Sequence, residues 1–161
     1  MKQYLIAGVI ILVLLVGAWY LMRSDASPEP ANTAISGKTL DLSGQGLTKA
    51  PEYIFSQTSI TTLNLSNNKL EGSLQAEIRH LENLVTLDLS NNKFTGVPAE
   101  VGQLKKLEVL NLSNNLLTGL PNELGNLSNL KLLDLSGNVY SEADLAIIRK
   151  NLPATTVIKV K

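Results

Sequence analysis

The chain has 161 residues, enough for one ordinary domain with an appendage, and 44% of them are apolar but only 4% aromatic, so leucine, isoleucine and valine must build any core. Fourteen basic residues balance fourteen acidic ones, with no basic stripe to neutralise phosphates, so nucleic acid is not an expected partner. The absence of cysteine excludes disulfides, cysteine zinc sites and thiol nucleophiles, and it fits reducing and oxidising compartments equally well.

The segment Tyr4–Met22 contains 19 residues without a charge. As a helix it would span about 28 Å, close to the hydrocarbon thickness of a bilayer. We therefore predict that residues 1–23 hold one uncleaved transmembrane helix, a signal anchor. A cleaved signal peptide is the alternative, although its apolar region is normally shorter. Lys2, before the apolar run, favours a cytoplasmic N-terminus with the rest of the chain outside, in a periplasm or at a cell surface.

Residues 24–36 have the sequence SDASPEPANTAIS, with two prolines, two acidic residues and few large apolar residues. This composition is typical of an extended, flexible tether. A recognition motif is the alternative, but the PEP sequence and its flanks complete no known binding pattern. We predict a linker between the anchor and the residues that follow.

Leucines recur at almost fixed intervals beyond Gly37. Steps of 23, 24, 23 and 23 residues separate five equivalent leucines, which are Leu42, Leu65, Leu89, Leu112 and Leu135. Four of the five units carry the pattern LxxLxLxxNxL. This pattern resembles the leucine-rich repeat family over about residues 38–140. The resemblance implies an α/β solenoid, a horseshoe segment of about five repeats in residues 37–140 with a parallel sheet on its concave side.

Both ends of the array depart from the repeat pattern. Gly37 and Gln45 replace the expected leucine and asparagine of the first unit, which indicates a modified N-terminal cap. The cysteine-clustered caps of animal and plant extracellular relatives are absent, so we expect a bacterial source. Residues 141–161 should form a C-terminal cap, because Ser141 opens a helical pattern that Pro153 ends, and Thr156–Lys161 reads as a short final strand.

Side chains alternate along a strand, so each repeat should bury its leucines and expose the residues between them on the concave side. Three exposed rows follow from the repeat spacing. The first row comprises Thr39, Thr62, Thr86, Val109 and Leu132. The second row comprises Asp41, Asn64, Asp88, Asn111 and Asp134. The third row comprises Ser43, Ser66, Ser90, Ser113 and Ser136.

The first two rows hold the candidate binding residues. The first row changes from threonines to Val109 and Leu132, and the position after each repeat asparagine changes from lysine to Leu116 and Val139. An apolar patch rimmed by polar residues is typical of a partner site, and the approach of the C-terminal cap is the alternative explanation. The second row alternates Asp and Asn, which doubles the spacing of like charges from about 4.8 to about 9.6 Å. This row is either a hydrogen-bonded ladder or a ligand site.

Four asparagines close the repeat motif, namely Asn68, Asn92, Asn115 and Asn138. We assign them a structural role, because their amides should satisfy buried backbone groups at the turn after each strand. No catalytic constellation, cofactor motif or metal-ligand cluster is evident, and His80 is expected to be solvated. A remote alternative is a carbohydrate-active enzyme that uses Asp41, Asp88 and Asp134 as paired carboxylates.

These features predict a non-enzymatic, membrane-anchored module that binds another protein or a cell-envelope component through its concave face. The motivation is a rigid exposed sheet that a tether joins to a membrane anchor. The alternative, of a different class, is a structural protein that packs laterally into an envelope assembly without a discrete ligand. Neither reading requires a cofactor or a metal.

Overall fold

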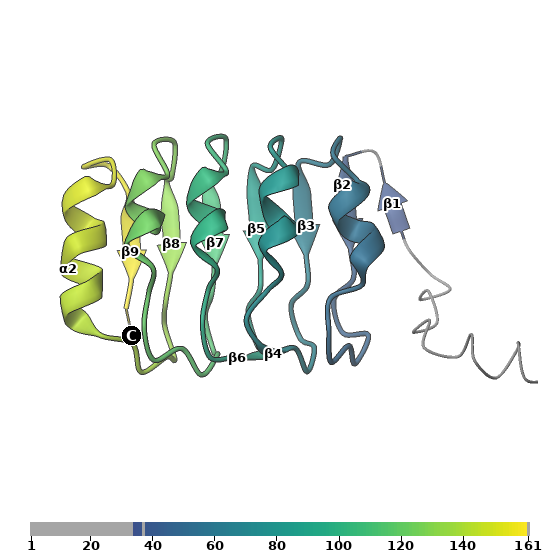
Figure 1. Ribbon diagram of the computed structural model, residues 1–161, viewed down its shortest axis with the longest axis horizontal. Helices are drawn as coiled ribbons and strands as arrows, with labels where there is room; N and C mark the ends of the chain where they lie inside the picture. The colour runs from purple at the N-terminus through teal and green to yellow at the C-terminus, as the bar shows by residue number, and fades with distance from the viewer. Residues whose placement is uncertain (1–33, 37, 161) are drawn as a thin grey trace, which may run out of the picture. The chain divides into compact units, whose positions relative to one another are not determined.

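The computed structural model describes residues 34–36 and 38–160 (Figure 1). The predicted anchor, Tyr4–Met22, and most of the predicted tether lie outside these residues. Within the described residues, no helix is both long enough and apolar enough to cross a membrane. The described residues form a stacked array in which each unit contributes a strand, a tight turn and a short helix.

The strands of the repeats are short, and each is centred on a leucine. They are β2 (Thr39–Asp41), β3 (Thr62–Asn64), β5 (Thr86–Asp88), β7 (Val109–Asn111) and β8 (Leu132–Asp134). Neighbouring strands are parallel and pair leucine beside leucine, so Leu63 lies between Leu40 and Leu87. A one-residue slip would turn the buried leucines to solvent, which fixes this register. The predicted solenoid with a parallel sheet is confirmed.

Two further strands extend this sheet to seven, in the order β1-β2-β3-β5-β7-β8-β9. β1 (Ala34–Ser36) pairs antiparallel with β2, and β9 (Val157–Lys159) pairs parallel with β8. β1 falls within residues 24–36, so the last three residues of the predicted tether belong to the sheet. Their backbone satisfies the outer edge of β2, which the first repeat leaves unpaired.

The second half of each of the first four units is a five-residue 3₁₀ helix. These helices are η1 (Glu52–Ser56), η2 (Ala76–His80), η3 (Ala99–Gln103) and η4 (Asn122–Asn126). Proline precedes three of them, where its missing N–H costs no helix bond. The four helices and α2 (Glu142–Asn151) lie on one side of the main sheet (Figure 1). No described element covers the other side, which corresponds to the predicted concave side and which we call the open face.

The second repeat, residues 60–83, is one residue longer than the repeat that follows it. It contributes one strand to a small second sheet. β4 (Glu71–Gly72) pairs in parallel with β6 (Lys93–Phe94). Gly72 has a φ of 70°, in the left-handed region that glycine enters at little cost. Both strands lie at the edge of the array where the parallel strands end, at the bottom of Figure 1. We call this edge the turn edge.

One continuous apolar core lies between the sheet and the helices. The central leucines of the repeat strands are fully buried, and they are Leu40, Leu63, Leu87, Leu110 and Leu133. The helices add buried side chains from the other side, and these include Ile54, Ile78, Val101 and Leu124. Because leucines of successive repeats stack, each unit completes the core of the next.

Four asparagine side chains tie successive repeats together. Asn92, which is only 8% exposed, accepts a 3.0 Å hydrogen bond from the N–H of Leu70. Its amide nitrogen donates bonds of 2.9, 3.1 and 3.1 Å to the carbonyl groups of Leu65, Leu89 and Ser90. The same four kinds of bond recur at Asn68, Asn115 and Asn138. Each amide therefore satisfies backbone groups of two units at once.

The residue just before each of these positions turns the chain. Asn67, Asn91 and Asn114 have φ values of 56°, 53° and 52°. Gly44 and Gly137 have φ values of 65° and 71° at the equivalent positions of the first and last units. Asparagine and glycine enter the left-handed region at lower cost than other residues. One such residue per repeat therefore starts the return from the sheet to the helices.

α2 and β9 close the C-terminal end of the array. The hydroxyl of Ser141 accepts a 3.3 Å hydrogen bond from the N–H of Asp144, as expected of an N-cap. The Asp144 carboxylate accepts a 3.1 Å bond from the N–H of Leu120, which links the helix to unit four. Leu145 and Ile148 are buried on the inner face of the helix. These contacts attach α2 to the last repeats.

Candidate functional site

The open face displays the first predicted row in register across the sheet. Backbone pairing aligns Thr39, Thr62, Thr86, Val109 and Leu132, and β9 extends the row by Val157. The five predicted members are half-buried, whereas Val157 is 57% exposed. Three adjacent strands, β7, β8 and β9, therefore present apolar side chains side by side. We call Val109, Leu132 and Val157 the apolar row.

The C-terminal cap does not cover the apolar row. α2 lies on the opposite side of the sheet (Figure 1), and β9 continues the sheet rather than folding over it. The sequence predicts a strand over Thr156–Lys161, but it does not predict how this strand pairs with its neighbour. The alignment of Val157 with Leu132 was therefore missed. The 25-residue step between these two residues, instead of 23, hides the periodicity.

The second row is also aligned, and its side chains accept hydrogen bonds from nearby backbone N–H groups. The row comprises Asp41, Asn64, Asp88, Asn111 and Asp134, and β9 adds Lys159. In all five Asp and Asn residues, Oδ1 accepts the N–H of the serine two residues further on, at 2.9 to 3.1 Å. This local turn is a common use of Asp and Asn where a strand ends.

Interactions along the second row join some of its neighbours. The amide of Asn111 donates a 3.1 Å hydrogen bond to Oδ2 of Asp88. The ammonium group of Lys159 lies 3.5 Å from the carboxylate of Asp134. Because many polar groups of this row already have partners within the protein, the apolar row is the better candidate for contact with a ligand.

The carboxyl groups at both ends of the second row are held in the charged form. The backbone N–H and the hydroxyl of Ser43 lower the pKa of Asp41, against a smaller opposing effect of burial. Burial is the largest single influence on Asp134 and raises its pKa, but hydrogen bonds from Ser136 and the charge of Lys159 together bring the pKa below its usual value. A glycosidase general acid needs a raised pKa, so these groups do not suit the carbohydrate-active alternative.

The third predicted row is buried at its three central positions. Ser66, Ser90 and Ser113 are only 6%, 5% and 8% exposed. The repeat strands end at the second row, and the chain then folds against the next repeat, where the N–H of Asn67 donates a 3.0 Å bond to the carbonyl of Ser90. The predicted exposure was wrong at these three serines, because it continued the alternation of a strand into a turn. Ser43 and Ser136, at the two ends of the row, are half-buried.

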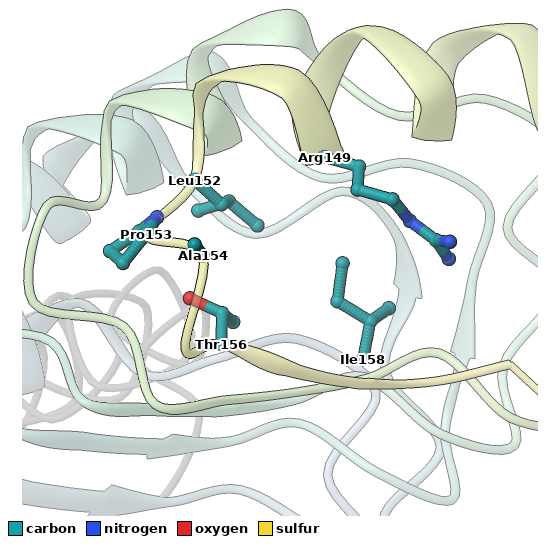
Figure 2. A pocket seen from close by; sticks show the side chains of 6 residues that line it. All are labelled: Arg149, Leu152, Pro153, Ala154, Thr156 and Ile158. Carbon is teal, nitrogen blue, oxygen red and sulfur yellow. The ribbon is translucent and has the colours of Figure 1, made fainter.

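A shallow pocket of about 250 Å³ lies at the C-terminal end, between α2 and β9. Its lining residues, shown in Figure 2, are Arg149, Leu152, Pro153, Ala154, Thr156 and Ile158. The guanidinium of Arg149 extends away from Leu152 in that view. The pocket lies apart from the predicted site residues. Among residues 34–36 and 38–160, no group of three or more His, Cys, Asp or Glu side chains could hold a metal ion.

Comparison with known families identifies the repeats. The family model described as leucine-rich repeat matches residues 38–94 and 82–139. The chain belongs to the leucine-rich repeat family. The two matches overlap because the family model covers more than one repeat of this regular array.

Curated relatives of this leucine-rich repeat protein include plant receptor-like proteins. Receptor-like protein 32 of Arabidopsis thaliana is 48% identical over 57 residues, which make up 35% of this chain and 7% of that protein. Receptor-like protein 34 of the same plant is 44% identical over 74 residues, or 46% of this chain and 8% of that protein. The matched repeats are thus a small part of these relatives.

Solved leucine-rich repeat structures have the same fold. A leucine-rich repeat protein of Leptospira interrogans is 42% identical with a TM-score of 0.64, over 70% of this chain and 28% of that chain. A chain in the crystal structure of the BIR3–SERK2 complex from Arabidopsis thaliana is 35% identical with a TM-score of 0.62, over 83% of this chain and 71% of that chain. Bacterial and plant proteins both occur among these matches, so the expected bacterial source stays a prediction.

Proposed function

We propose that this leucine-rich repeat array is a non-enzymatic binding module that holds another protein on its open face, with the apolar row as the centre of contact. The single observation that carries the proposal is the alignment of Val109, Leu132 and Val157 on three adjacent strands that no described element covers. Contiguous exposed apolar side chains with a polar surround are typical of protein interfaces.

The surroundings of the apolar row favour a protein as the binding partner rather than a small molecule. The threonines of the same row and the Asp and Asn residues beside it supply a polar rim on a rigid sheet. Small ligands prefer enclosed pockets, whereas a broad open sheet suits a protein surface. Two of the similar structures are of complexes, BIR3 with SERK2 and PEPR1 with AtPEP1. A cell-envelope component is the other class of partner that such a face could hold.

The proposal places the array beside a membrane. Its support is the uncharged segment Tyr4–Met22, which is long enough and apolar enough to span a bilayer as one helix. The basic start of the chain favours an N-terminus in the cytoplasm and repeats outside it, in a periplasm or at a cell surface.

Photo-crosslinking in the cells of origin tests the binding face. We would place a photoreactive amino acid at Val157 in the full chain, and as a matched control at Asn126, which is exposed on the helix side of the array. We expect a discrete protein adduct at Val157 and none of the same mass at Asn126. Replacing Val109 and Leu132 by Asp should remove most of the adduct, because charged side chains would be desolvated in the interface.

Three outcomes would contradict the proposal. The same adduct could form from Asn126, the Asp variant could keep its adduct while remaining folded, or the adduct could be the chain itself. The last result would favour the structural alternative, in which copies pack laterally in an envelope assembly. Circular dichroism of each variant shows whether the fold is retained.

A further inference from the structure

The exposed large apolar residues of the described chain are few. They are Leu116 and Val139, at 57% and 85% exposure, with Ile147 at 46% and Val157 at 57%. Val157 belongs to the apolar row and Ile147 to α2. Leu116 and Val139 belong to neither, and they occupy the same position in successive repeats. The open face therefore does not account for them.

Leu116 and Val139 continue a row that begins with two lysines. Each residue of this row follows a repeat asparagine, and the row comprises Lys69, Lys93, Leu116 and Val139. The backbone N–H groups of Leu116 and Val139 donate to the carbonyl groups of Phe94 and Leu117 in the preceding units, at 2.9 and 3.2 Å. The corresponding bonds of Lys69 and Lys93 are both 2.8 Å. Because these bonds repeat, the four residues form one line along the turn edge, which we call the turn-edge row.

The first described strand, β1, begins at this same edge. In the antiparallel pair of β1 and β2, Ala34 lies opposite Asp41, the last residue of β2. β2 runs parallel to the other repeat strands, so Ala34 lies at the turn edge. Residues 24–33 can reach at most about 33–36 Å when fully extended. Ala34, which follows this short stretch of sequence, therefore lies at the edge that carries Leu116 and Val139.

We propose that the turn-edge row rests on the lipid bilayer that holds the anchor, with Leu116 and Val139 in the boundary between headgroups and acyl chains. This inference rests on the membrane anchoring proposed above. Large apolar side chains bind at this boundary, while lysines keep their ammonium groups among the headgroups and lay their stems along the apolar layer. Anchoring raises the local concentration of the bilayer, so two side chains suffice for a contact that would be weak in solution.

Among the described residues, the opposite edge carries lysines but no exposed large apolar side chain. There the loops lead from the helices into the strands, and its exposed residues include Lys105, Lys106 and Ser128. The exposed large apolar residues of the described chain do not include any at that edge. Contact through the turn edge would set the sheet upright on the membrane, which leaves the open face free for a partner.

Apolar contact rather than charge should dominate this interaction. The ammonium of Lys93 lies 3.0 Å from the carboxylate of Glu71, which offsets one of the two positive charges of the turn-edge row. We therefore expect binding to uncharged phosphatidylcholine, with little gain from an anionic lipid.

Fluorescence of the reconstituted full chain tests the contact. The chain has no cysteine, so Val139→Cys and Ser128→Cys each give one site for an environment-sensitive dye. Both native side chains are exposed, and they lie on opposite edges. In phosphatidylcholine vesicles that contain a nitroxide-labelled lipid, we expect several-fold stronger quenching at position 139 than at position 128. Adding Leu116→Asp to Val139→Cys should remove most of this difference.

The outcomes separate this inference from the anchoring on which it rests. Flotation of the same vesicles reports anchoring alone. Equal quenching at both positions in a chain that floats overturns the edge contact and leaves the anchor standing. A chain that fails to float overturns both. Disulfide-linked dimers of the unlabelled Val139→Cys chain, together with no lipid quenching of the labelled chain, would show that a second copy covers the row, and would also overturn the proposal.

Discussion

The buried asparagines are the residues on which each turn depends. Asn92 bonds to four backbone groups, and an alanine in its place would leave all four without that partner in a region closed to water. An unsatisfied buried polar group costs about 1–3 kcal/mol, which exceeds the net gain of an average hydrogen bond. These residues therefore serve the fold.

Asn92→Ala should lower the free energy of unfolding by about 2–5 kcal/mol, because the freed carbonyl and N–H groups cannot all find new partners. Urea unfolding followed by circular dichroism measures the change. Asn126→Ala is the control, since that side chain is exposed, and it should change stability by less than about 0.5 kcal/mol. Equal effects of the two substitutions would refute the structural role of Asn92.

The sequence allowed some residue-level predictions and not others. The buried role of Asn92 could be inferred from a polar residue at a fixed place among leucines. The left-handed turn at Asn91 has an equally regular signal, an Asn or Gly just before each repeat asparagine, but the pattern of apolar residues does not reveal it. The burial of Ser90 could not be predicted, because it depends on how the chain turns beyond the strand.

Among the elements, the 3₁₀ helices pack closely where the sequence has glycine. Gly102 in η3 and Gly125 in η4 stand at equivalent positions. A Cβ atom on Gly102 would overlap the carbonyl oxygen of Glu123 in η4, and one on Gly125 would lie 2.8 Å from Cβ of Asn151 in α2. The absence of a side chain at these positions sets the spacing of the last helices.

Gly102→Ala should destabilise the array by about 1–3 kcal/mol, because the backbone of η4 must move to admit the methyl group. Gly96→Ala is the matched control, since nothing lies within 4 Å of a Cβ built there and its φ is not positive. Thermal unfolding of both variants gives the comparison. A neutral Gly102→Ala would mean that η3 and η4 are not closely packed.

Elements were predictable where the repeat specifies them. The strands around Leu63 and Leu110 and their parallel register follow from the spacing of the leucines. β1 was not predicted, because Ala34–Ser36 has no repeat pattern and pairs with β2 only when the array supplies an edge. The apolar row was foreseen as far as Leu132, and its extension by β9 depends on a loop of irregular length.

At the scale of the whole array, one core runs through all units. Each repeat contacts mainly its neighbours, and none buries its leucines alone. A short stack of this kind should unfold as one cooperative unit, because opening any repeat exposes the core of the two beside it.

Leu110→Ala, in the central strand β7, should lower the free energy of unfolding by about 2–5 kcal/mol through a cavity in this core. Hydrogen exchange then reports how far the effect spreads. Protection of β2 and β8, on either side of the cavity, should fall by the same free energy. A loss confined to β7 and β8 would show that the array opens in parts and that the core is not one cooperative unit.

The alternation of Asp and Asn in the second row also bears on how such a gene can lengthen. A duplicated coding segment of one repeat would add one strand and one turn asparagine in register, but it would place two aspartates or two asparagines side by side. A duplicated segment of two repeats would keep the order from Asp88 to Asp134. Relatives that grew by copying pairs of units would therefore keep the charge spacing of this sheet, whereas a single copied unit with Asp would bring two like charges together and need a compensating substitution.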